Sequence, residues 1–372
     1  MANVTQDKIM AEITKEQVEE AIKGYIEPHL ETDLVSAKSV KDVTIDGDQV
    51  TVRLEMGFPA KGVHEQITAA VKKAVEAVDG VASCEIDLST KIVAHSVQKA
   101  LKPIDNVKNI IAVASGKGGV GKSTTAVNLA LALSAEGARV GILDADIYGP
   151  SQPRMLGITG KPESKDGNTL EPMTSYHLQA MSIGFLIDEE TPMIWRGPMV
   201  TQALEQLLND TNWEELDYLV IDLPPGTGDT QLTLAQKVPV SGAIIVTTPQ
   251  DIALLDARKG FKMFEKVEVP ILGIVENMSI HICSQCGHEE HIFGEGGGER
   301  MASEYGVNFL GALPLETRIR EETDSGKPTV VAEPESRPSM IYREIARKAA
   351  AKLSRQAKSY AAKFPNIVIQ NN

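Results

Sequence analysis

The glycine-rich segment 116–123, with the sequence GKGGVGKS, constrains the fold of this chain more than any other feature. It satisfies the pattern GxxxxGK[ST], and it lies directly between an apolar run at 110–114 and a segment of helical character, TTAVNLALALS. A strand, a glycine-rich turn and a helix in this order form a phosphate-binding loop (P-loop), because the glycines let consecutive backbone N–H groups converge on phosphate oxygens at the positive end of the helix. The segment therefore predicts a site for a nucleotide such as ATP.

The P-loop pattern also gives its polar side chains separate roles. Lys122 should reach the β- and γ-phosphates of ATP, and the Ser123 hydroxyl should bind Mg²⁺. The residues expected to contact the nucleotide here are Gly116, Gly118, Gly119, Val120, Gly121, Lys122, Ser123 and Thr124.

Two further apolar runs end in carboxylates that suit the same site. The run 218–221 ends in Asp222, as a Walker B motif requires, and we expect this residue to hold Mg²⁺. The run 140–143 ends in Asp144-Ala145-Asp146, which places two carboxylates at the edge of the sheet where ligands bind in such folds. One of them is expected to orient the attacking water, and Asp146 is favoured over Asp144. Either could instead cap a helix or bind in the metal shell.

The pattern of apolar runs predicts the fold class of the larger part of the chain. Short runs without alternation occur at 110–114, 140–143, 218–221, 242–247 and 271–275, with helical segments between them. Buried parallel strands have this pattern. We therefore expect an α/β fold with a doubly wound, mostly parallel sheet.

The N-terminal part has a different character. A helix is expected over 14–29 with Ile26 on its apolar face, followed by a hairpin turning at Asp-Gly 46–47, a helix near 62–78 and a strand near 83–88. This order predicts a small α+β domain ahead of the P-loop domain. The expected boundaries are 1–94 for the small domain, 95–108 for a linker, 109–363 for the P-loop domain and 364–372 for a tail.

The charge and hydropathy of the chain exclude several functions. The net charge of -14 argues against a broad surface for nucleic acid or for an anionic membrane. A basic stretch from Arg343 to Lys363 is one candidate for a local patch, but it is alanine-rich, with few bulky apolar anchors for a bilayer. No apolar run has membrane-spanning length, and the N-terminus has no signal-like apolar segment. We therefore expect a cytoplasmic protein that binds neither nucleic acid nor membrane.

The chain has three cysteines, and two of them form a CxxC pair. In a reducing compartment, Cys283 and Cys286 at this spacing indicate metal binding or redox work. They supply half of the four ligands usual for zinc or for a [4Fe–4S] cluster. His288 and His291 could complete a zinc site within one chain, or the same pair of a second subunit could complete a four-cysteine cluster on a two-fold axis. Cys84 lies on an expected strand and is interpreted as a small buried hydrophobe.

These motifs together resemble the Mrp/ApbC family of iron–sulfur carrier ATPases, relatives of MinD, ParA and the nitrogenase iron protein. The motifs that carry the resemblance occur in the family's order and are SGKGGVGKST, LDADIYGPS, WRGPM, DYLVIDLPPGTGD, VTTPQD and ENMS followed by CxxC. The N-terminal part is similar to the small iron–sulfur assembly domain often fused ahead of such ATPases. Some stand-alone versions carry a cysteine after the second strand, whereas 56–61 here has none, so we expect this domain to dock partners.

The resemblance implies an ATP-hydrolysing carrier that assembles a [4Fe–4S] cluster at the interface of a homodimer and transfers it to apo-proteins. Cys283 and Cys286 of both subunits would hold the cluster, and donor or scaffold proteins would supply it. Lys117, the extra lysine of a deviant Walker A motif, would cross the interface to the phosphates of the partner's nucleotide. Asn277 would contact adenine, or else cap a helix or turn.

Two other functions are compatible with parts of the sequence. A positioning ATPase of the MinD/ParA type would need a membrane-targeting helix or a DNA-binding face, and it would have no use for CxxC. A regulatory ATPase stabilised by zinc would use the cysteines with His288 and His291.

Overall fold

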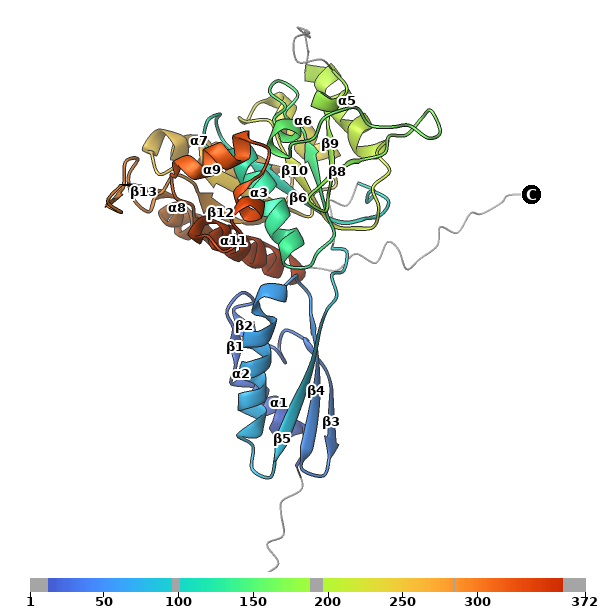
Figure 1. Cartoon of the computed structure of the whole chain (residues 1–372), viewed down its shortest axis with the longest axis vertical. Coiled ribbons are helices and arrows are strands. Elements are labelled where there is room, and N and C mark those ends of the chain that lie inside the picture. The colour runs from blue at the N-terminus through green and yellow to red at the C-terminus, as the bar shows by residue number, and fades with distance from the viewer. Residues whose placement is uncertain (1–12, 96–100, 188–196, 284, 357–372) are drawn as a thin grey trace, which may run out of the picture. The chain divides into compact units, whose positions relative to one another are not determined.

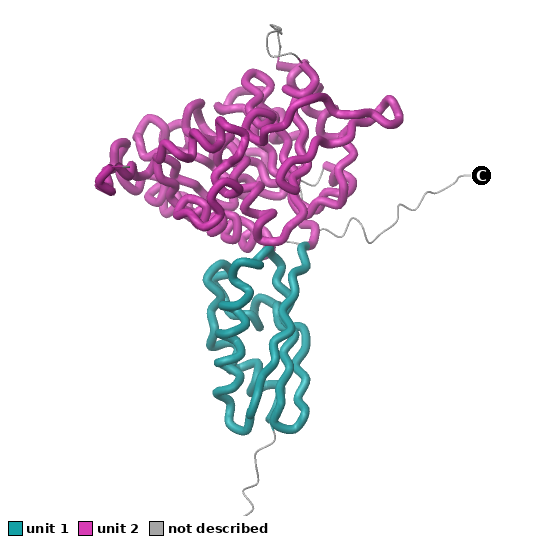
Figure 2. The backbone as a smooth tube through the Cα atoms, in the orientation of Figure 1, with its two compact units in different colours: residues 1–92 teal, residues 93–372 magenta. Residues whose placement is uncertain are grey.

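The computed structural model describes residues 13–95, 101–187, 197–283 and 285–356. The chain divides into two compact units, residues 1–92 and residues 93–372 (Figure 2). The expected tail, the end of the basic stretch, and Trp195 and Arg196 of the WRGPM motif lie outside the described residues.

The first unit has the expected α-β-β-α-β order, with one addition. Strand β3 pairs antiparallel with β4 around Gly47, whose φ of +61° suits the Asp-Gly turn, and β4 pairs in parallel with β5. A short antiparallel pair, β1 and β2, was not expected. The elements are α1 (Lys15–Lys23), β1 (Ile26–Glu27), β2 (Thr32–Asp33), β3 (Val40–Asp46), β4 (Gln49–Met56), the 3₁₀ turn η1 (Lys61–Val63), α2 (His64–Glu76) and β5 (Ser83–Thr90).

The first helix is shorter than predicted. A capping box between Thr14 and Gln17 begins α1, and Gly24 ends it with an N–H that bonds back to Ala21. The expected extension to residue 29 was wrong: Ile26 lies in β1 with 56% of its surface exposed. Glycine has a low helix propensity, and after Gly24 the chain passes into strand β1.

The second unit is built on one eight-stranded sheet, in the order β15-β12-β11-β6-β10-β7-β9-β8. All neighbouring strands are parallel except β8, which is antiparallel to β9 at the edge. Every residue of the central strands β10 and β11 is buried, so helices cover both of their faces. The expected doubly wound, mostly parallel α/β fold is confirmed.

The strands of this unit are β6 (Val107–Ala114), β7 (Val140–Asp144), β8 (Met173–Ser175), β9 (Leu178–Ser182), β10 (Leu216–Asp222), β11 (Gly242–Thr247), β12 (Ile271–Glu276), β13 (His281–Ile282), β14 (Glu289–Glu290) and β15 (Phe309–Ala312). Its helices are α3 (Lys122–Ala135), α4 (Gln152–Met155), η2 (Ile183–Phe185), α5 (Gly197–Asn209), α6 (Asp229–Lys237), α7 (Asp251–Lys266), α8 (Gly297–Tyr305), α9 (Thr317–Asp324), α10 (Thr329–Ala332) and α11 (Arg337–Ser354).

The five apolar runs of the sequence are strands β6, β7, β10, β11 and β12, as predicted. Strand β6 begins at Val107, so the last two residues of the expected linker belong to the sheet. Near the other end of the linker, His95 is buried, and its backbone N–H donates to the side-chain oxygen of Asn109, at 3.1 Å. No described helix combines the length and hydrophobicity needed to cross a bilayer.

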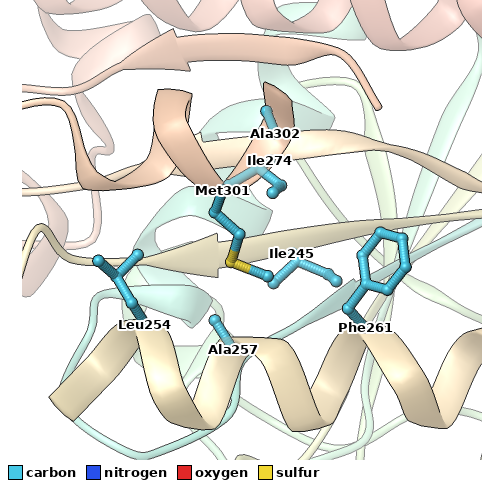
Figure 3. Packing of buried hydrophobic residues seen from close by; sticks show 7 residues of the cluster. All are labelled: Ile245, Leu254, Ala257, Phe261, Ile274, Met301 and Ala302. Carbon is cyan, nitrogen blue, oxygen red and sulfur yellow. The ribbon is translucent and has the colours of Figure 1, made fainter. Parts of the chain in front are cut away.

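Two helix contacts matter for the site. The helix that follows the P-loop, α3, packs along α11 (Figure 1), and buried Glu136 at the end of α3 accepts hydrogen bonds from Arg343 and Arg347 at 2.7 Å each. These two arginines of the expected basic patch are therefore ion-paired inside the fold. On β11 and β12, helices α7 and α8 close a hydrophobic cluster (Figure 3), made of Ile245, Leu254, Ala257, Phe261, Ile274, Met301 and Ala302. This cluster fixes the position of α7 beside the P-loop.

Candidate functional site

The sequence-predicted site residues gather at one edge of the large sheet. The P-loop follows β6 near the middle of the sheet, and Asp144 and Asp222 end the strands β7 and β10. Asn277 follows the last residue of β12. Because these strands are parallel, their carboxyl ends meet at the same edge, where ligands bind in open α/β sheets.

The glycines of the P-loop serve different purposes. Gly119 and Gly121 have φ of +81° and +80°, which side-chain-bearing residues rarely adopt. Gly116 is needed for packing: a Cβ there would lie 2.6 Å from the backbone nitrogen of Ala257 in α7, and nearer still to the carbonyl of Asp256. At Gly118 a Cβ would meet nothing within 4 Å. The loop is thus shaped by α7 as well as by its own turn.

Lys122 lies at the centre of the site. It is buried, and its Nζ donates to the carboxylate of Asp222 and, at 3.1 Å, to Ser123 Oγ. Asp222 is fully buried as the last residue of β10. The lysine, the hydroxyl and the carboxylate named from the sequence are therefore neighbours in space, and the two oxygen donors are of the type that suits Mg²⁺.

Gln152 completes this group and was missed by the sequence reasoning. Its Nε2 donates to Asp222 Oδ2 at 2.9 Å and to the Ser123 backbone oxygen at 3.2 Å. The residue is 1% exposed and begins α4. No spacing rule points to it, since its side chain reaches the site only because the chain turns back after β7.

The two carboxylates after β7 have different environments. Asp144 is fully buried, and its Oδ2 accepts the backbone N–H groups of Ser151 and Gln152 and the hydroxyl of Ser182. Burial raises the pKa of Asp144 to about 7, and the nearby Asp222 carboxylate adds to this shift. Asp144 thus holds the start of α4.

Asp146 is only partly buried. Burial raises its pKa, and the Lys122 ammonium opposes that shift. Hydrogen bonds from the backbone N–H groups of Gly149 and Tyr148 also lower the pKa of Asp146. Asp146 is the more exposed of the two carboxylates.

Asn277 contacts the P-loop directly. Its Nδ2 donates to the Val120 backbone oxygen at 2.9 Å, and a Cβ on Gly121 would overlap the same amide. Lys117 is half-buried next to exposed Gly118. Thr124, on the first turn of α3, has a backbone oxygen that accepts a hydrogen bond from Asn128.

The CxxC pair lies in a two-stranded hairpin, β13 and β14. The Cys283 N–H donates to His288 O at 2.9 Å, and the Gly287 N–H donates to Cys283 O at 2.8 Å. Gly287 has a φ of +70°, as this knuckle requires. Backbone N–H groups of Gln285 and then Cys286 lower the pKa of the Cys283 thiol, which favours the thiolate that binds metals.

Both thiols are accessible. Cys286 is exposed, and Cys283 lies on the wall of a cavity of about 960 Å³ between the hairpin and the segments around α9 and α11. Cys84, in contrast, is buried in the first unit as expected, and burial raises its pKa to about 11.

The histidines of the zinc alternative lie in the cysteine hairpin or directly after it. His291 Nδ1 donates to Ser279 O at 2.9 Å, and its Nε2 lies 3.8 Å from Glu295. His288 is exposed. Among the described residues, no three side chains of His, Cys, Asp or Glu are grouped as metal ligands. Within the described part of the chain, the two histidines are thus not grouped with the two cysteines as metal ligands.

The fold and this site define a P-loop nucleotide hydrolase. A solved nucleotide-binding protein from Archaeoglobus fulgidus, in complex with ADP, is 39% identical, with a TM-score of 0.55 over 62% of this chain and 90% of that chain. The NUBPL iron-transfer P-loop NTPase family model matches residues 106–350, and an iron–sulfur cluster assembly protein model matches residues 15–88. The chain belongs to this iron-transfer P-loop NTPase family and is an ATPase of that group.

Curated relatives agree with this assignment. An iron–sulfur cluster carrier protein from Pseudomonas fragi is 60% identical over 278 residues, which cover 74% of this chain and 97% of that protein. A protein of the same description from Escherichia coli K12 is 51% identical over 343 residues, covering 92% and 93% respectively. The resemblance read from the sequence motifs is confirmed.

Proposed function

We propose that this protein uses ATP hydrolysis in the cytoplasm to carry a [4Fe–4S] cluster, which it assembles at a homodimer interface and transfers to apo-proteins. The observation that carries the proposal is the CxxC knuckle, which has two accessible thiols and no third metal ligand grouped with them among the described residues. The knuckle follows closely after Asn277, whose side chain donates a hydrogen bond to the P-loop. The names of the relatives, iron–sulfur cluster carrier proteins, support an iron–sulfur cluster as the cargo.

The nucleotide half of the proposal follows from the polar groups at the sheet edge. Lys122 would move from Asp222 to the β- and γ-phosphates, leaving Asp222 and Ser123 Oγ to hold Mg²⁺. Mg²⁺ would neutralise charge that develops on the phosphate oxygens. Asp146 would orient the attacking water, and Asp144 would keep α4 in place.

Lys117 would act on the nucleotide of the partner subunit. It is half-buried next to exposed Gly118 at the open edge of the P-loop. The proposed role explains why a second lysine lies in a loop whose own phosphate contact is made by Lys122.

The cluster half of the proposal follows from ligand count. A [4Fe–4S] cluster takes four thiolates, and the knuckle of one chain offers Cys283 and Cys286. A two-fold axis that places two knuckles together supplies the rest. The small N-terminal unit, whose only cysteine is buried Cys84, would dock donor, scaffold or recipient proteins.

Anaerobic cluster reconstitution tests the proposal. We expect about four irons per dimer, a visible chromophore, and a dimer on size-exclusion chromatography with light scattering. Cys283→Ala or Cys286→Ala should each remove nearly all the iron, because the dimer then keeps two of the four thiolates, one from each subunit, and two ligands cannot hold the cluster.

Matched variants in the same preparation serve as controls. Cys84→Ala removes a buried thiol outside the knuckle, and His288→Ala and His291→Ala remove the ligands of the zinc alternative. All three should keep the iron content of the wild type. One tightly bound zinc per chain, lost with either histidine and indifferent to dimer formation, would overturn the carrier proposal.

A further inference from the structure

A short stretch of chain, residues 277–283, joins the P-loop to the cysteine knuckle. At its first residue, the Asn277 amide donates to the Val120 backbone oxygen, and no space remains between this amide and Gly121. At its last residue, Cys283 closes the knuckle through its backbone bonds to His288 and Gly287. A displacement of the P-loop at Val120 therefore acts directly on one end of this stretch.

The stretch is anchored along its length. The Ser279 N–H and its hydroxyl both donate to Leu313 O, at 3.0 Å each. The next residue, Ile280, accepts the Leu315 N–H at 2.7 Å, and His281 Nδ1 donates to Leu315 O at 3.1 Å. A segment bonded at successive residues moves as a unit, whereas a loose linker would absorb a displacement.

Both arms of the cysteine hairpin are tied to the same point. His291, which follows β14, donates from Nδ1 to Ser279 O at 2.9 Å. Ser279 thus donates to Leu313, just after β15, through its N–H and its hydroxyl. Its carbonyl accepts a hydrogen bond from His291, at the end of the hairpin. A shift of Ser279 reaches the knuckle from both sides.

A backbone kink separates the P-loop contact from this anchored part. Met278 has a φ of +55°, the left-handed region that non-glycine residues occupy only when the surroundings hold them there. Its side-chain methyl also lies 3.8 Å from the position of a Cβ on Gly121. The strained residue is therefore next to both the loop and Ser279.

We infer that Asn277 is a positioning residue that transmits the nucleotide occupancy of the P-loop to Cys283 and Cys286 through residues 277–283. The inference rests on the proposed function and adds the route by which the two sites influence each other. Phosphate would bind to the backbone N–H groups of the loop that Asn277 contacts, and transmission requires that the bound and free loops favour different positions of Asn277. A ligand changes a distant site only through such a difference in affinity for two arrangements.

Thiol reactivity of the full-length apo-protein tests the inference. The alkylation rates of Cys283 and Cys286 by iodoacetamide are measured by peptide mass spectrometry, without nucleotide and with saturating Mg·ADP. We expect the nucleotide to change these rates by about fivefold or more in the wild type, while Cys84, 4% exposed, remains unmodified. Nucleotide affinity is measured separately with a fluorescent ADP analogue, so that every variant is compared at saturation.

Three variants locate the route. Asn277→Ala removes the bond to Val120, and His291→Ala removes the bond to Ser279; each should abolish the effect of Mg·ADP on the thiols while the protein still binds ADP at saturation. His288→Ala, in the same hairpin but without the bond to Ser279, is the matched control and should respond as the wild type does. Equal rates with and without Mg·ADP in the wild type, or an undiminished response in Asn277→Ala and His291→Ala, would overturn the inference. A wild-type protein that fails to bind the ADP analogue would overturn the proposed function together with it.

Discussion

Gly116→Ala tests whether α7 shapes the nucleotide site. The added methyl group would lie 2.6 Å from Ala257 N and nearer to the Asp256 carbonyl, whereas ordinary van der Waals contact begins at 3.4 Å. Loop or helix must therefore move by at least about 0.8 Å, the difference between these distances. Helix α7 cannot yield easily, because Leu254, Ala257 and Phe261 are buried in the cluster of Figure 3. The P-loop should move instead.

Such a shift has two measurable effects. Overpacking of this kind costs about 1–3 kcal/mol in the free energy of unfolding, which corresponds to a Tm lower by about 2–12 °C for a unit of this size. Misplacement of catalytic groups by about 1 Å costs on the order of 100-fold in rate. We therefore expect both a lower Tm and a strongly reduced ATPase rate.

Thermal unfolding, ATPase turnover and titration with a fluorescent ADP analogue measure these effects. Gly118→Ala is the matched control, since a Cβ at that position meets nothing within 4 Å; its Tm should stay near that of the wild type. If Gly116→Ala unfolded at the wild-type temperature and bound ADP with unchanged affinity, the packing argument for this glycine would be refuted.

Four other predictions concern single side chains. Lys122→Ala should lower ATPase turnover by roughly 100-fold or more, because it removes the cation expected on the phosphates; near-normal turnover would exclude that role. Lys117→Ala should lower turnover but keep ADP binding, and mixing it with Lys122→Ala chains should restore activity; no rescue in proven mixed dimers would argue against action across the interface. Asp146→Asn should lower turnover at an unchanged Tm, whereas Asp144→Asn should lower the Tm as well, since it holds α4; the reverse pattern would exchange their roles. Glu136→Ala should lower the free energy of unfolding by about 1.5–3 kcal/mol, since it removes the carboxylate shared by buried Arg347 and partly buried Arg343 while Arg347 keeps its pair with Glu344; a loss below about 1 kcal/mol would show that the pairs contribute little.

The central sheet could be predicted because its strands are buried on both faces. The runs that became β6, β7, β10, β11 and β12 are continuously apolar for that reason. The strands at or next to the sheet edges carry weaker patterns: β8 and β9 mix polar with apolar residues, and β15 has four residues, so none of the three was expected. The end of α1 was misplaced because the helical spacing of apolar residues continues past Gly24 to Ile26, whereas the helical backbone ends at Lys23.

The candidate site could be predicted as far as its residues lie in contiguous motifs. The P-loop and the two carboxylate-ended strands meet because parallel strands end at one edge. Gln152 could not be found in this way, since its contact with Asp222 joins residues far apart in sequence. The same holds for the packing of Gly116 on α7 and for the bond between His291 and Ser279, which depend on tertiary contacts.

The ion pairs of Glu136 with Arg343 and Arg347 determine where the C-terminal part of the chain can be shortened or extended. Helix α3 starts at Lys122 in the P-loop, and Glu136 follows its other end, so α11 supports this helix along its outer side. A fusion partner joined after Arg355 leaves that support complete. A deletion that removes Arg347 takes one of its two arginine partners from the buried Glu136 carboxylate. It would also weaken the packing of α11 on α3, the helix that follows the P-loop.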